Sequence, residues 1–600
     1  MTNDLELLRR YEPIVRYTQG EMFLPCPVEP YVERCSLWTR PPNGPPAEVV
    51  PAGRLTMESL CRYASEHQEP MFLRFVDKPL GRLEYERWRA NRPPFHGSGR
   101  LARVGLGPRF LDSLFSLSLL LRGRVPGGTA ARASIQYGEM REECPCVPYY
   151  GRVVRREGYI VLQYLFFYAM NDWRSSFFGV NDHEADWEQL FVYLEDVDGG
   201  APRPVWLACA AHDYSGDDLR RRWDDPELHI VDGHPVVYAG AGSHATYFKP
   251  GEYLSSVEIK PLRPLVRAAY VVRRIWRDVL GQGEPAAFVK GVEALVRVPF
   301  VDYARGDGSS VGPGQAFEWS PAAVSDDVDW VVAYRGLWGL DTEDIFSGEQ
   351  APAGPRFTRD GSVRQSWYDP LGWAGLNKVA PPSRAGVTLD QRVEELRADL
   401  EAANGEAETL REQLPRLEVE SRLLRADPQL RAQRTALERE LAKGEAELNR
   451  LEARAQELSR SIETISRQRD CIRAGDMGDP RAHIRRSHEP EPAEAARQGR
   501  LAETWAALSI GLLLLTAVAL IRFGSTDTIA ALVTLVGGAI LVDNILRGTL
   551  RPLLMNTSIV LAVITTLILV YEFFWQMALA GIAAIGLILV LQNIRRLRGR

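Results

Sequence analysis

The stretch Gly158-Tyr-Ile-Val-Leu-Gln-Tyr-Leu-Phe-Phe-Tyr168 decides the fold of the amino-terminal half of the chain. It is a run of aromatic and branched apolar residues bounded by glycine, which is typical of a buried β-strand. Further runs of this kind occur at residues 189–194, 204–211 and 235–239. Pieces with helical spacing lie around them, at residues 56–66, 110–121 and 264–280. The pattern predicts a β-rich domain, a sandwich with helical insertions.

The composition excludes several classes of protein. Of 600 residues, 45% are hydrophobic and 25% are charged, so the chain is neither wholly disordered nor collagen-like. The formal charge of -6 is small for this length, and no Lys/Arg-rich run marks the main body. A nucleic-acid partner is therefore not expected, because such proteins carry a basic stripe.

Polarity changes sharply along the chain and divides it into four parts. The second part is almost entirely Leu, Ala, Glu, Arg and Gln, and the last part is almost free of charge. We therefore expect a multidomain protein with a β-rich sandwich, a helical coiled coil, a linker and a four-helix transmembrane bundle. The predicted boundaries are residues 1–385, 388–473, 474–502 and 503–596.

Four apolar stretches near the carboxyl terminus predict the membrane anchor. Each approaches the ~20 residues that a helix needs to cross a bilayer, and only helices can satisfy their backbone groups there. They are residues 505–521, 528–542, 553–570 and 577–594. The only ionisable residue expected inside the membrane is Asp543, near a helix end directly after the second stretch, and no interior charge pair is evident, which argues against a transporter or a channel.

Arginine residues set the expected orientation of the anchor. They precede the first stretch, lie between the second and third, and close the chain, and positive flanks belong on the cytoplasmic side. The first ten residues carry no apolar signal core. We therefore expect a multi-pass cell-membrane protein whose amino-terminal domain and carboxyl terminus are cytoplasmic, with membrane lipids as partners.

The seven cysteines fit a cytoplasmic location. They are scattered and odd in number, so they form no disulfide framework. Cys144-Pro-Cys146 is by itself too isolated to predict a metal or redox motif.

The second part has the apolar spacing of a coiled coil. A strict 4-3 alternation runs from Leu437 to Ile472 with charged flanks, and Asp427-Pro428 divides the region into two arms of similar length. Two packings fit: an antiparallel hairpin within one chain, which the proline break and matched arms favour, or a parallel homo-oligomer. The region is either a plain spacer or a surface for a coiled-coil partner.

Candidate chemistry gathers between residues 171 and 246, where five of the nine histidines lie. In the stretch Asn181-Asp-His-Glu-Ala-Asp-Trp-Glu188, strand alternation points Asp186 and Glu188 one way and Trp187 the other. A loop carrying His183 is expected to fold back over the two carboxylates. A bound divalent cation would relieve their repulsion, and mostly oxygen ligands favour Mg, Mn or Ca over Zn. The alternative is a pair of solvated carboxylates.

Two further histidines follow predicted strands. His212 lies in Ala211-His-Asp-Tyr-Ser-Gly216 and His244 in Gly240-Ala-Gly-Ser-His-Ala-Thr-Tyr-Phe248, both turns of small residues that suit close approach to a ligand. We expect His183, His212 and His244 to meet at one rim, with His212 and His244 as candidate general acids or bases.

These stretches carry a resemblance to a known family. His183-Glu-Ala-Asp-Trp-Glu188, the opening Gly20-Glu-Met-Phe-Leu-Pro25 and Gly242-Ser-His-Ala-Thr-Tyr247 resemble the Vps62-related family over residues ~10–380. The chain is more distantly similar to the NPP1-like necrosis-inducing proteins, whose hallmark is Gly-His-Arg-His-Asp-Trp-Glu. That resemblance implies a β-sandwich with a divalent cation held by Asp172, His183, Asp186 and Glu188. Ala185 stands where those proteins have their second histidine, and the resemblance does not imply toxicity.

Three functions remain open from the sequence. The first is a cation-binding module that recognises a polar ligand such as a lipid headgroup or glycan, with the coiled coil for assembly. The second is a structural or scaffolding membrane protein. The third is a metal-dependent hydrolase that uses His212 or His244, although no nucleophile motif or phosphate-binding glycine loop accompanies them.

Overall fold

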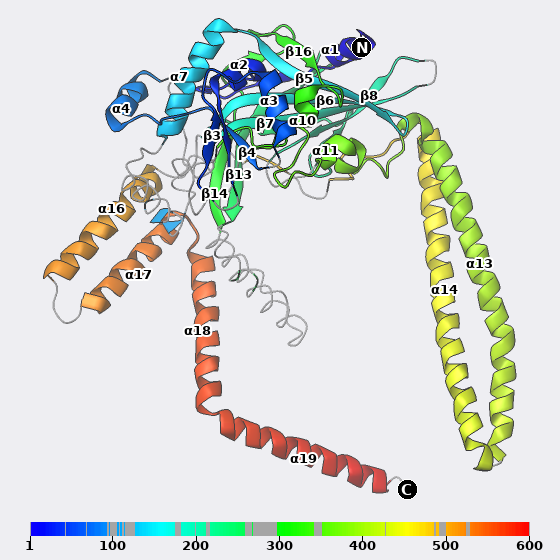
Figure 1. The fold of residues 1–600 in the computed structure, drawn as a ribbon. Helices are drawn as coiled ribbons and strands as arrows, with labels where there is room; N and C mark the ends of the chain where they lie inside the picture. Colours follow the sequence, from blue (N-terminus) through cyan, green and yellow to red (C-terminus); the bar gives the residue numbers. More distant parts are fainter. Residues whose placement is uncertain are drawn as a thin grey trace.

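The structure is a computed structural model in which a β-rich amino-terminal region precedes a helical carboxy-terminal region (Figure 1). The β-rich region that the sequence predicts is thus confirmed. The description covers residues 2–41, 44–67, 69–92, 95, 105–106, 109–110, 113, 127–173, 182–197, 200–211, 216–258, 264, 267, 297–340, 351–426, 428–484, 488–490, 500–523 and 528–598. The predicted helices at 110–121 and 264–280 fall almost wholly outside these residues.

A six-stranded sheet with the order β16-β5-β6-β7-β8-β9 forms the centre of the β-rich region. β6 and β7 are the longest strands and pair with each other in antiparallel register. The strands are β16 (Trp319–Ala323), β5 (Val147–Arg156), β6 (Tyr159–Asn171), β7 (His183–Glu195), β8 (Arg203–Cys209) and β9 (Arg220–Arg222).

The apolar run of β6 is buried on both faces, which explains why it shows no polar alternation. Leu162, Tyr164 and Phe166 face a core shared with a second sheet. Leu165 and Phe167 face a separate core that includes helices and a third sheet. The central strand therefore holds two hydrophobic layers together.

Three smaller sheets surround the centre. A five-stranded sheet has the order β10-β11-β1-β15, with β12 paired to β11, a second sheet has the order β3-β2-β4, and β13 pairs with β14. Their bounds are β1 (Ile14–Arg16), β2 (Ser36–Thr39), β3 (Ala47–Val50), β4 (Met71–Arg74), β10 (His229–Val231), β11 (His234–Ala239), β12 (Thr246–Tyr247), β13 (Gly251–Glu258), β14 (Arg297–Ala304) and β15 (Ser310–Val311).

Short helices lie among the sheets of the amino-terminal region. The predicted helix at 56–66 is α3, which begins after Thr56, whose side chain accepts a hydrogen bond from the Ser59 amide at 3.2 Å. The described helices here are α1 (Thr2–Arg10), α2 (Val28–Arg34), α3 (Met57–Glu66), α4 (Arg82–Asn91), α7 (Gly128–Glu143), α10 (Asp329–Ala333), α11 (Gln365–Tyr368) and α12 (Pro370–Trp373).

Two long helices, α13 (Pro382–Leu423) and α14 (Arg431–Arg473), form a hairpin that projects from the β-rich region (Figure 1). The short 3-10 turns η2 (Leu424–Ala426) and η3 (Pro428–Leu430) join them. At 1.5 Å per residue, each helix is about 63 Å long. The helices run in opposite directions, because Asp390 near the start of α13 pairs with Arg469 near the end of α14 at 3.2 Å.

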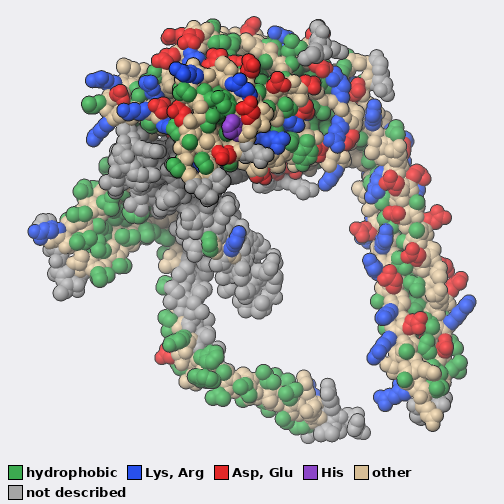
Figure 2. Space-filling model, in the orientation of Figure 1, with side chains coloured by type: hydrophobic (Ala, Val, Ile, Leu, Met, Phe, Trp, Pro, Cys, Tyr) green, Lys and Arg blue, Asp and Glu red, His purple; other side chains and the backbone are tan. Residues whose placement is uncertain are grey.

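The seam of the hairpin is apolar and its outer surface is charged (Figure 2). Ala403 and Ala407 of α13 pack with Leu448 and Leu451 of α14. Leu448 and Leu451 belong to the 4-3 alternation, so this repeat serves contacts within one chain. The hairpin is one of the two packings that the sequence left open.

Among the described residues, three helices are long and apolar enough to cross a membrane: Thr504–Arg522 within α16 (Arg500–Phe523), Thr528–Leu546 as α17, and Phe574–Arg595 within α19 (Phe574–Arg598). The predicted span at 553–570 lies in α18 (Leu550–Glu572), several of whose side chains are outside the described residues, and is not among the three.

The predicted four-helix bundle is not seen among the described helices. Only α16 and α17 lie side by side, whereas α18 and α19 extend away from them end to end (Figure 1). The physical reason is that apolar helices gain little by packing on one another in place of lipid tails. Large side chains such as Leu515 and Ile582 are exposed on them.

A buried charge pair joins the amino-terminal region to the apolar helices α16 and α17, contrary to the expectation that no such pair exists. The Arg109 guanidinium pairs with Asp543 of α17 and donates a hydrogen bond to Ser509 of α16 at 3.2 Å. Both charged side chains are almost fully buried. The sequence could not show this pair because its members are 434 residues apart.

Part of the segment predicted as a linker is bound to the β-rich region. We call residues 476–484 and 488–490 the strap. Arg222 of β9 donates hydrogen bonds to the carbonyl oxygens of Met477 and Gly478 at 2.7 and 3.0 Å. Pro490 lies so close to Gly251 that a Cβ atom there would be 2.4 Å from the proline Cβ. The strap is therefore packed against the β-rich region, whereas a free linker would make no such contacts.

Candidate functional site

The stretch that carries the predicted chemistry is itself a strand. Residues 183–188 form the first half of β7, and His183 lies opposite Asn171 of β6 in the register. The expectation that His183 lies on a loop folded over the carboxylates is therefore wrong. The β6–β7 ladder extends past the apolar residues, because backbone pairing does not require apolar side chains.

Asp186 and Trp187 point to opposite faces of the sheet, as strand alternation predicts. Trp187 packs on Phe167 and Trp338, with ring centroids 4.9 and 5.5 Å apart. Asp186 lies on the other face and reaches His244. Glu188 shares the face of Asp186, since both lie opposite β6 residues of the same core.

The alternation breaks at Ala185, which has a φ of 58°. Glu184 consequently faces the layer of Trp187 instead of that of Asp186. Its carboxylate accepts hydrogen bonds from the amides of Phe75 and Val76 at 2.9 and 2.8 Å. Burial raises the pKa of Glu184 to about 7, although these hydrogen bonds act to lower it.

The centre of the site is the imidazole of His244, whose side chain is fully buried. Its Nδ1 lies 3.0 Å from Asp186 Oδ2, and its Nε2 lies 3.7 Å from Glu21 Oε1. The ring stacks on Tyr168 with a centroid separation of 3.7 Å and an interplanar angle of 5°. The Tyr168 hydroxyl is in turn 3.0 Å from the hydroxyl of Tyr17. One imidazole thus lies between two carboxylates and on one aromatic ring.

The charges of the two carboxylates keep His244 protonated. Burial by itself would lower the pKa of His244, but Asp186 and Glu21 raise it to about 9. The group is therefore an imidazolium at neutral pH. A positive charge from the chain itself therefore lies beside Asp186.

The other predicted metal ligands lie in different settings. His183 is buried, and its Nδ1 is 2.7 Å from the carbonyl oxygen of Ala185. The amide of Asp172 donates to the carbonyl of Gly242 at 2.9 Å. Glu188 is half-buried. Burial lowers the pKa of Arg364, whereas the negative charges of Glu188 and Asp186 act to raise it. Arg364 thus lies within electrostatic range of Asp186 and Glu188.

Within the part of the chain that is described, no group of three or more His, Cys, Asp or Glu side chains has the geometry to hold a metal ion. His212 lies outside the described residues. The meeting of His183, His212 and His244 at one rim is therefore not seen. The role of His212 or His244 as a general acid or base stays a prediction; in this structure the His244 side chain is fully buried and its raised pKa keeps it protonated at neutral pH.

Sequence reasoning missed Glu21, which completes the site. Its Oε1 accepts hydrogen bonds from the amides of Met22 and Phe23 at 2.8 and 2.9 Å, and its Oε2 accepts one from Gly242 at 2.7 Å. Glu21 belongs to the opening stretch that carries the family resemblance. The resemblance was the only signal in the sequence that pointed to Glu21. No local pattern links Glu21 to His244, which lies more than 200 positions further along the chain.

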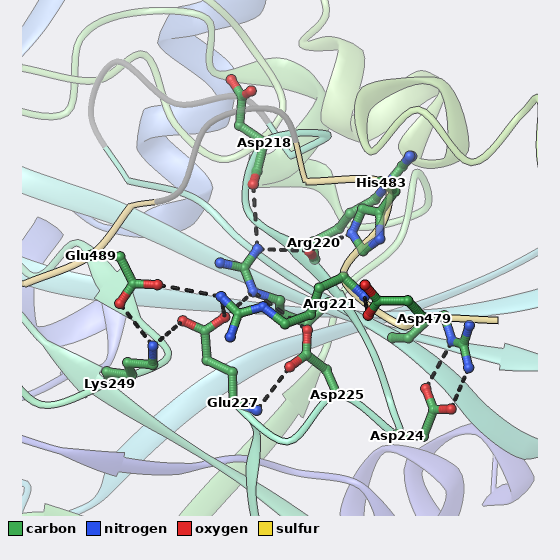
Figure 3. Close-up of polar contacts among 12 residues, drawn as sticks. Asp218, Arg220, Arg221, Asp224, Asp225, Glu227, Lys249, Asp479, His483 and Glu489 are labelled. Carbon is green, nitrogen blue, oxygen red and sulfur yellow. Dashed lines mark hydrogen bonds and ion pairs between the residues drawn. The ribbon is translucent and has the colours of Figure 1, made fainter.

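A second polar cluster holds the strap against the β-rich region (Figure 3). Arg221 and Glu227, both almost fully buried, pair at 2.5 Å. Although burial acts to raise the pKa of Glu227, the hydrogen bond and charge of Arg221 lower it. Lys249 bridges Glu227 at 3.1 Å to Glu489 of the strap at 2.8 Å.

Aromatic contacts add to this cluster. The ring of His483 meets Trp206 edge-on at 5.1 Å, and His483 Nε2 is 3.1 Å from the carbonyl oxygen of Arg220. Further along the strap, the ring of His488 lies 4.9 Å from Tyr253. Charged, hydrogen-bonding and aromatic groups all fix the strap in place.

Comparison of the chain with protein-family models, with curated proteins and with solved structures gives no match. The resemblance to the Vps62-related family therefore rests on the residues quoted above. The function has to be argued from the geometry.

Proposed function

We propose that the chain is a membrane-anchored, non-catalytic scaffold whose helical hairpin is a stiff arm that holds a partner protein at a fixed distance from the membrane. In this proposal the hairpin is an antiparallel coiled coil in the cytoplasm, and the β-rich region is its base. The observation that carries the proposal is the docked strap, which fastens the returning end of the arm to the base.

The outgoing end of the arm is also fastened. Glu195 of β7 is almost fully buried and accepts a hydrogen bond from the Ser383 amide in the first turn of α13 at 3.0 Å. The same carboxylate pairs with Arg203 of β8 at 2.5 Å. The Arg384 guanidinium lies against Gly158 at the β5–β6 turn, 3.1 Å from an ideal Cβ position. Since both ends of the hairpin are attached to one sheet, we expect the arm to keep one direction.

The base is in turn attached to the membrane helices. The pair of Arg109 with Asp543 is buried, and Asp543 also pairs with Arg547 at 3.4 Å. Removing one partner of a buried ion pair costs about 3–5 kcal/mol. The attachment of the base to α17 is therefore expected to be stable. Arm, base and anchor would then act as one body.

Shortening the arm tests the proposal. Deleting residues 397–410 and 450–463 removes two heptads from each helix, keeps the seam in phase and shortens the arm by about 21 Å. A biotin ligase inserted at the hairpin turn would report the neighbouring proteins in the cell. We expect the shortened protein to reach the membrane and its tip to label a different set of proteins. An unchanged set would contradict the proposal.

A matched control separates the effect of the length of the arm from that of its charged outer surface. It keeps the full length and the apolar seam but exchanges Glu and Arg at exposed positions of the same two pairs of heptads. If the arm is a spacer, this control labels the same proteins as the original chain. If the outer surface binds the partner, the control behaves like the shortened arm.

A second candidate function is recognition of a polar ligand, such as a lipid headgroup or glycan, with the help of Mg, Mn or Ca. The observation that favours it is the half-buried Glu188 on the face of Asp186, with Arg364 nearby. Calorimetric titration of the full chain with each cation, compared with the Asp186→Ala/Glu188→Ala variant, tests it. Equal heats for both proteins would exclude it.

A further inference from the structure

Cys144 and Cys146 lie where α7 ends and β5 begins. Cys144 follows the last residue of α7 and its amide donates to the carbonyl of Met140, and Val147 begins β5. The three residues 144–146 belong to neither element. Both cysteines are half-buried.

The sulfur atoms of this pair are in contact, with Sγ atoms 3.0 Å apart. Residues two apart in an extended segment share a face, and Cys144 has φ -132° and ψ 88°, at the edge of the extended region. Cα atoms two residues apart in such a segment are roughly 6–7 Å apart, near the upper end of the range that a disulfide spans. Closing the sulfurs therefore needs only a small change in the backbone.

We propose that Cys144 and Cys146 form a reversible thiol switch, a dithiol that a low-molecular-weight disulfide such as oxidised glutathione converts to an intramolecular disulfide. The Cys144 thiolate attacks the glutathione disulfide, which forms a mixed disulfide and releases one glutathione. The Cys146 thiolate then attacks Cys144 Sγ and releases the second glutathione. Two thiol protons are lost and two glutathione thiols are formed, so the exchange balances. This switch goes beyond the proposed scaffold function.

The surroundings decide the roles of the two sulfurs. Burial and the hydrogen bond with Cys144 raise the pKa of Cys146 to about 11. Because the thiolate is the attacking form of cysteine, a raised pKa makes Cys146 the poorer first nucleophile, and the proposal therefore gives the first attack to Cys144. Once Cys144 carries glutathione, this hydrogen bond is lost, which favours ionisation of Cys146 for the second step.

The pair is set apart from the other thiols of the described chain. Cys26, Cys35 and Cys209 are buried and burial raises the pKa of each, so they are unsuited to exchange. Cys61 and Cys471 are half-buried like the pair, but among the described residues the sulfur–sulfur contact is seen at Cys144 and Cys146. In the reducing cytoplasm the pair would stay a dithiol and close only under oxidation.

The test uses the full chain in nanodiscs, equilibrated with glutathione buffers of increasing oxidation, quenched with acid and analysed by peptide mass mapping. We expect the peptide with residues 144–146 to lose two hydrogen atoms without gaining glutathione. In Cys146→Ser the mixed disulfide should accumulate on Cys144. In the matched controls Cys61→Ser and Cys471→Ser the pair should close as in the original chain.

Two results would overturn the switch. One is a stable glutathione adduct on the 144–146 peptide of the original chain, which would mean that the second sulfur does not attack. The other is a peptide that stays fully reduced at glutathione ratios where Cys61 is already modified. Both are read on the original chain, so neither depends on whether a variant folds.

Discussion

The imidazole Nδ1 of His244 lies 3.0 Å from the Oδ2 of Asp186, and the two residues are 58 positions apart. His244 has a φ of 57°, a conformation that non-glycine residues adopt at a cost of order 1–2 kcal/mol. The ion pairs with Asp186 and Glu21 offset that cost. The resulting imidazolium balances two buried carboxylates at the junction of the two main sheets.

The charge of His244 predicts how stability depends on pH. The pKa of His244 is about 9 in the folded protein and about 6.5 in an unfolded chain, so its contribution is complete below pH 6.5 and is lost as pH rises through 9. We expect the free energy of unfolding of the β-rich region to fall by about 3 kcal/mol across that window. Urea unfolding followed by tryptophan fluorescence measures it. His244→Gln should flatten the curve and His229→Gln, on the exposed edge strand, should not.

A glycine at the same site has no room for a side chain. Gly242 has a φ of 72°, and a Cβ atom there would lie 1.6 Å from the carbonyl oxygen of Asp172. We expect Gly242→Ala to lower the free energy of unfolding by at least about 2 kcal/mol. Gly233→Ala is the matched control, because Gly233 has a φ of 87° with nothing near its Cβ position. Equal losses would show that the backbone conformation alone sets the cost.

The buried pair under the strap predicts a large effect on strap docking. Arg221→Met removes the closest cation of the Glu227 carboxylate, which still has Lys249 at 3.1 Å and Arg481 at 3.5 Å, so we expect a loss of at most about 3 kcal/mol. Limited trypsin digestion should then cut at Arg481 sooner. The partly exposed Glu489 serves as the control, because Glu489→Gln should cost less than about 1 kcal/mol. An Arg221→Met protein that resists trypsin as before would contradict the role of the pair.

The attachment to the membrane helices predicts rescue by charge exchange. Arg109→Asp and Asp543→Arg should each lower the thermal stability of the protein in detergent, since each places two like charges together. Combining them restores opposite charges between the two positions, but Arg547 then lies beside a second arginine, so we expect the double variant to recover part of the loss. Absence of recovery would mean that the two residues do not pair.

Patterns local in sequence predicted much of the fold. The apolar run of β6, the hydropathy of α16, α17 and α19 and the 4-3 spacing of α14 each depend on neighbouring residues, and periodicity reports such neighbours directly. The alternation of Asp186 and Trp187 was predicted for the same reason.

The features that the sequence did not predict depend mostly on contacts between residues far apart in the chain. The carboxylate of Glu21 reaches His244 across 223 positions, and Arg109 reaches Asp543 across 434. The break at Ala185 came from a positive φ at a residue type that rarely adopts one. The strap looked like a linker because its Pro, Gly and charged residues bind through ion pairs, rings and backbone carbonyls, none of which leaves a periodic pattern.

The stiffness of the arm is the central claim, and the distance from its tip to the base tests it most directly. Spin labels would be placed at exposed Arg425 and Glu48 through a keto amino acid, which leaves the seven cysteines untouched. Electron–electron double resonance on the full chain in nanodiscs should give a single narrow distance distribution that broadens in Arg221→Met. A broad distribution in the original chain would contradict the account.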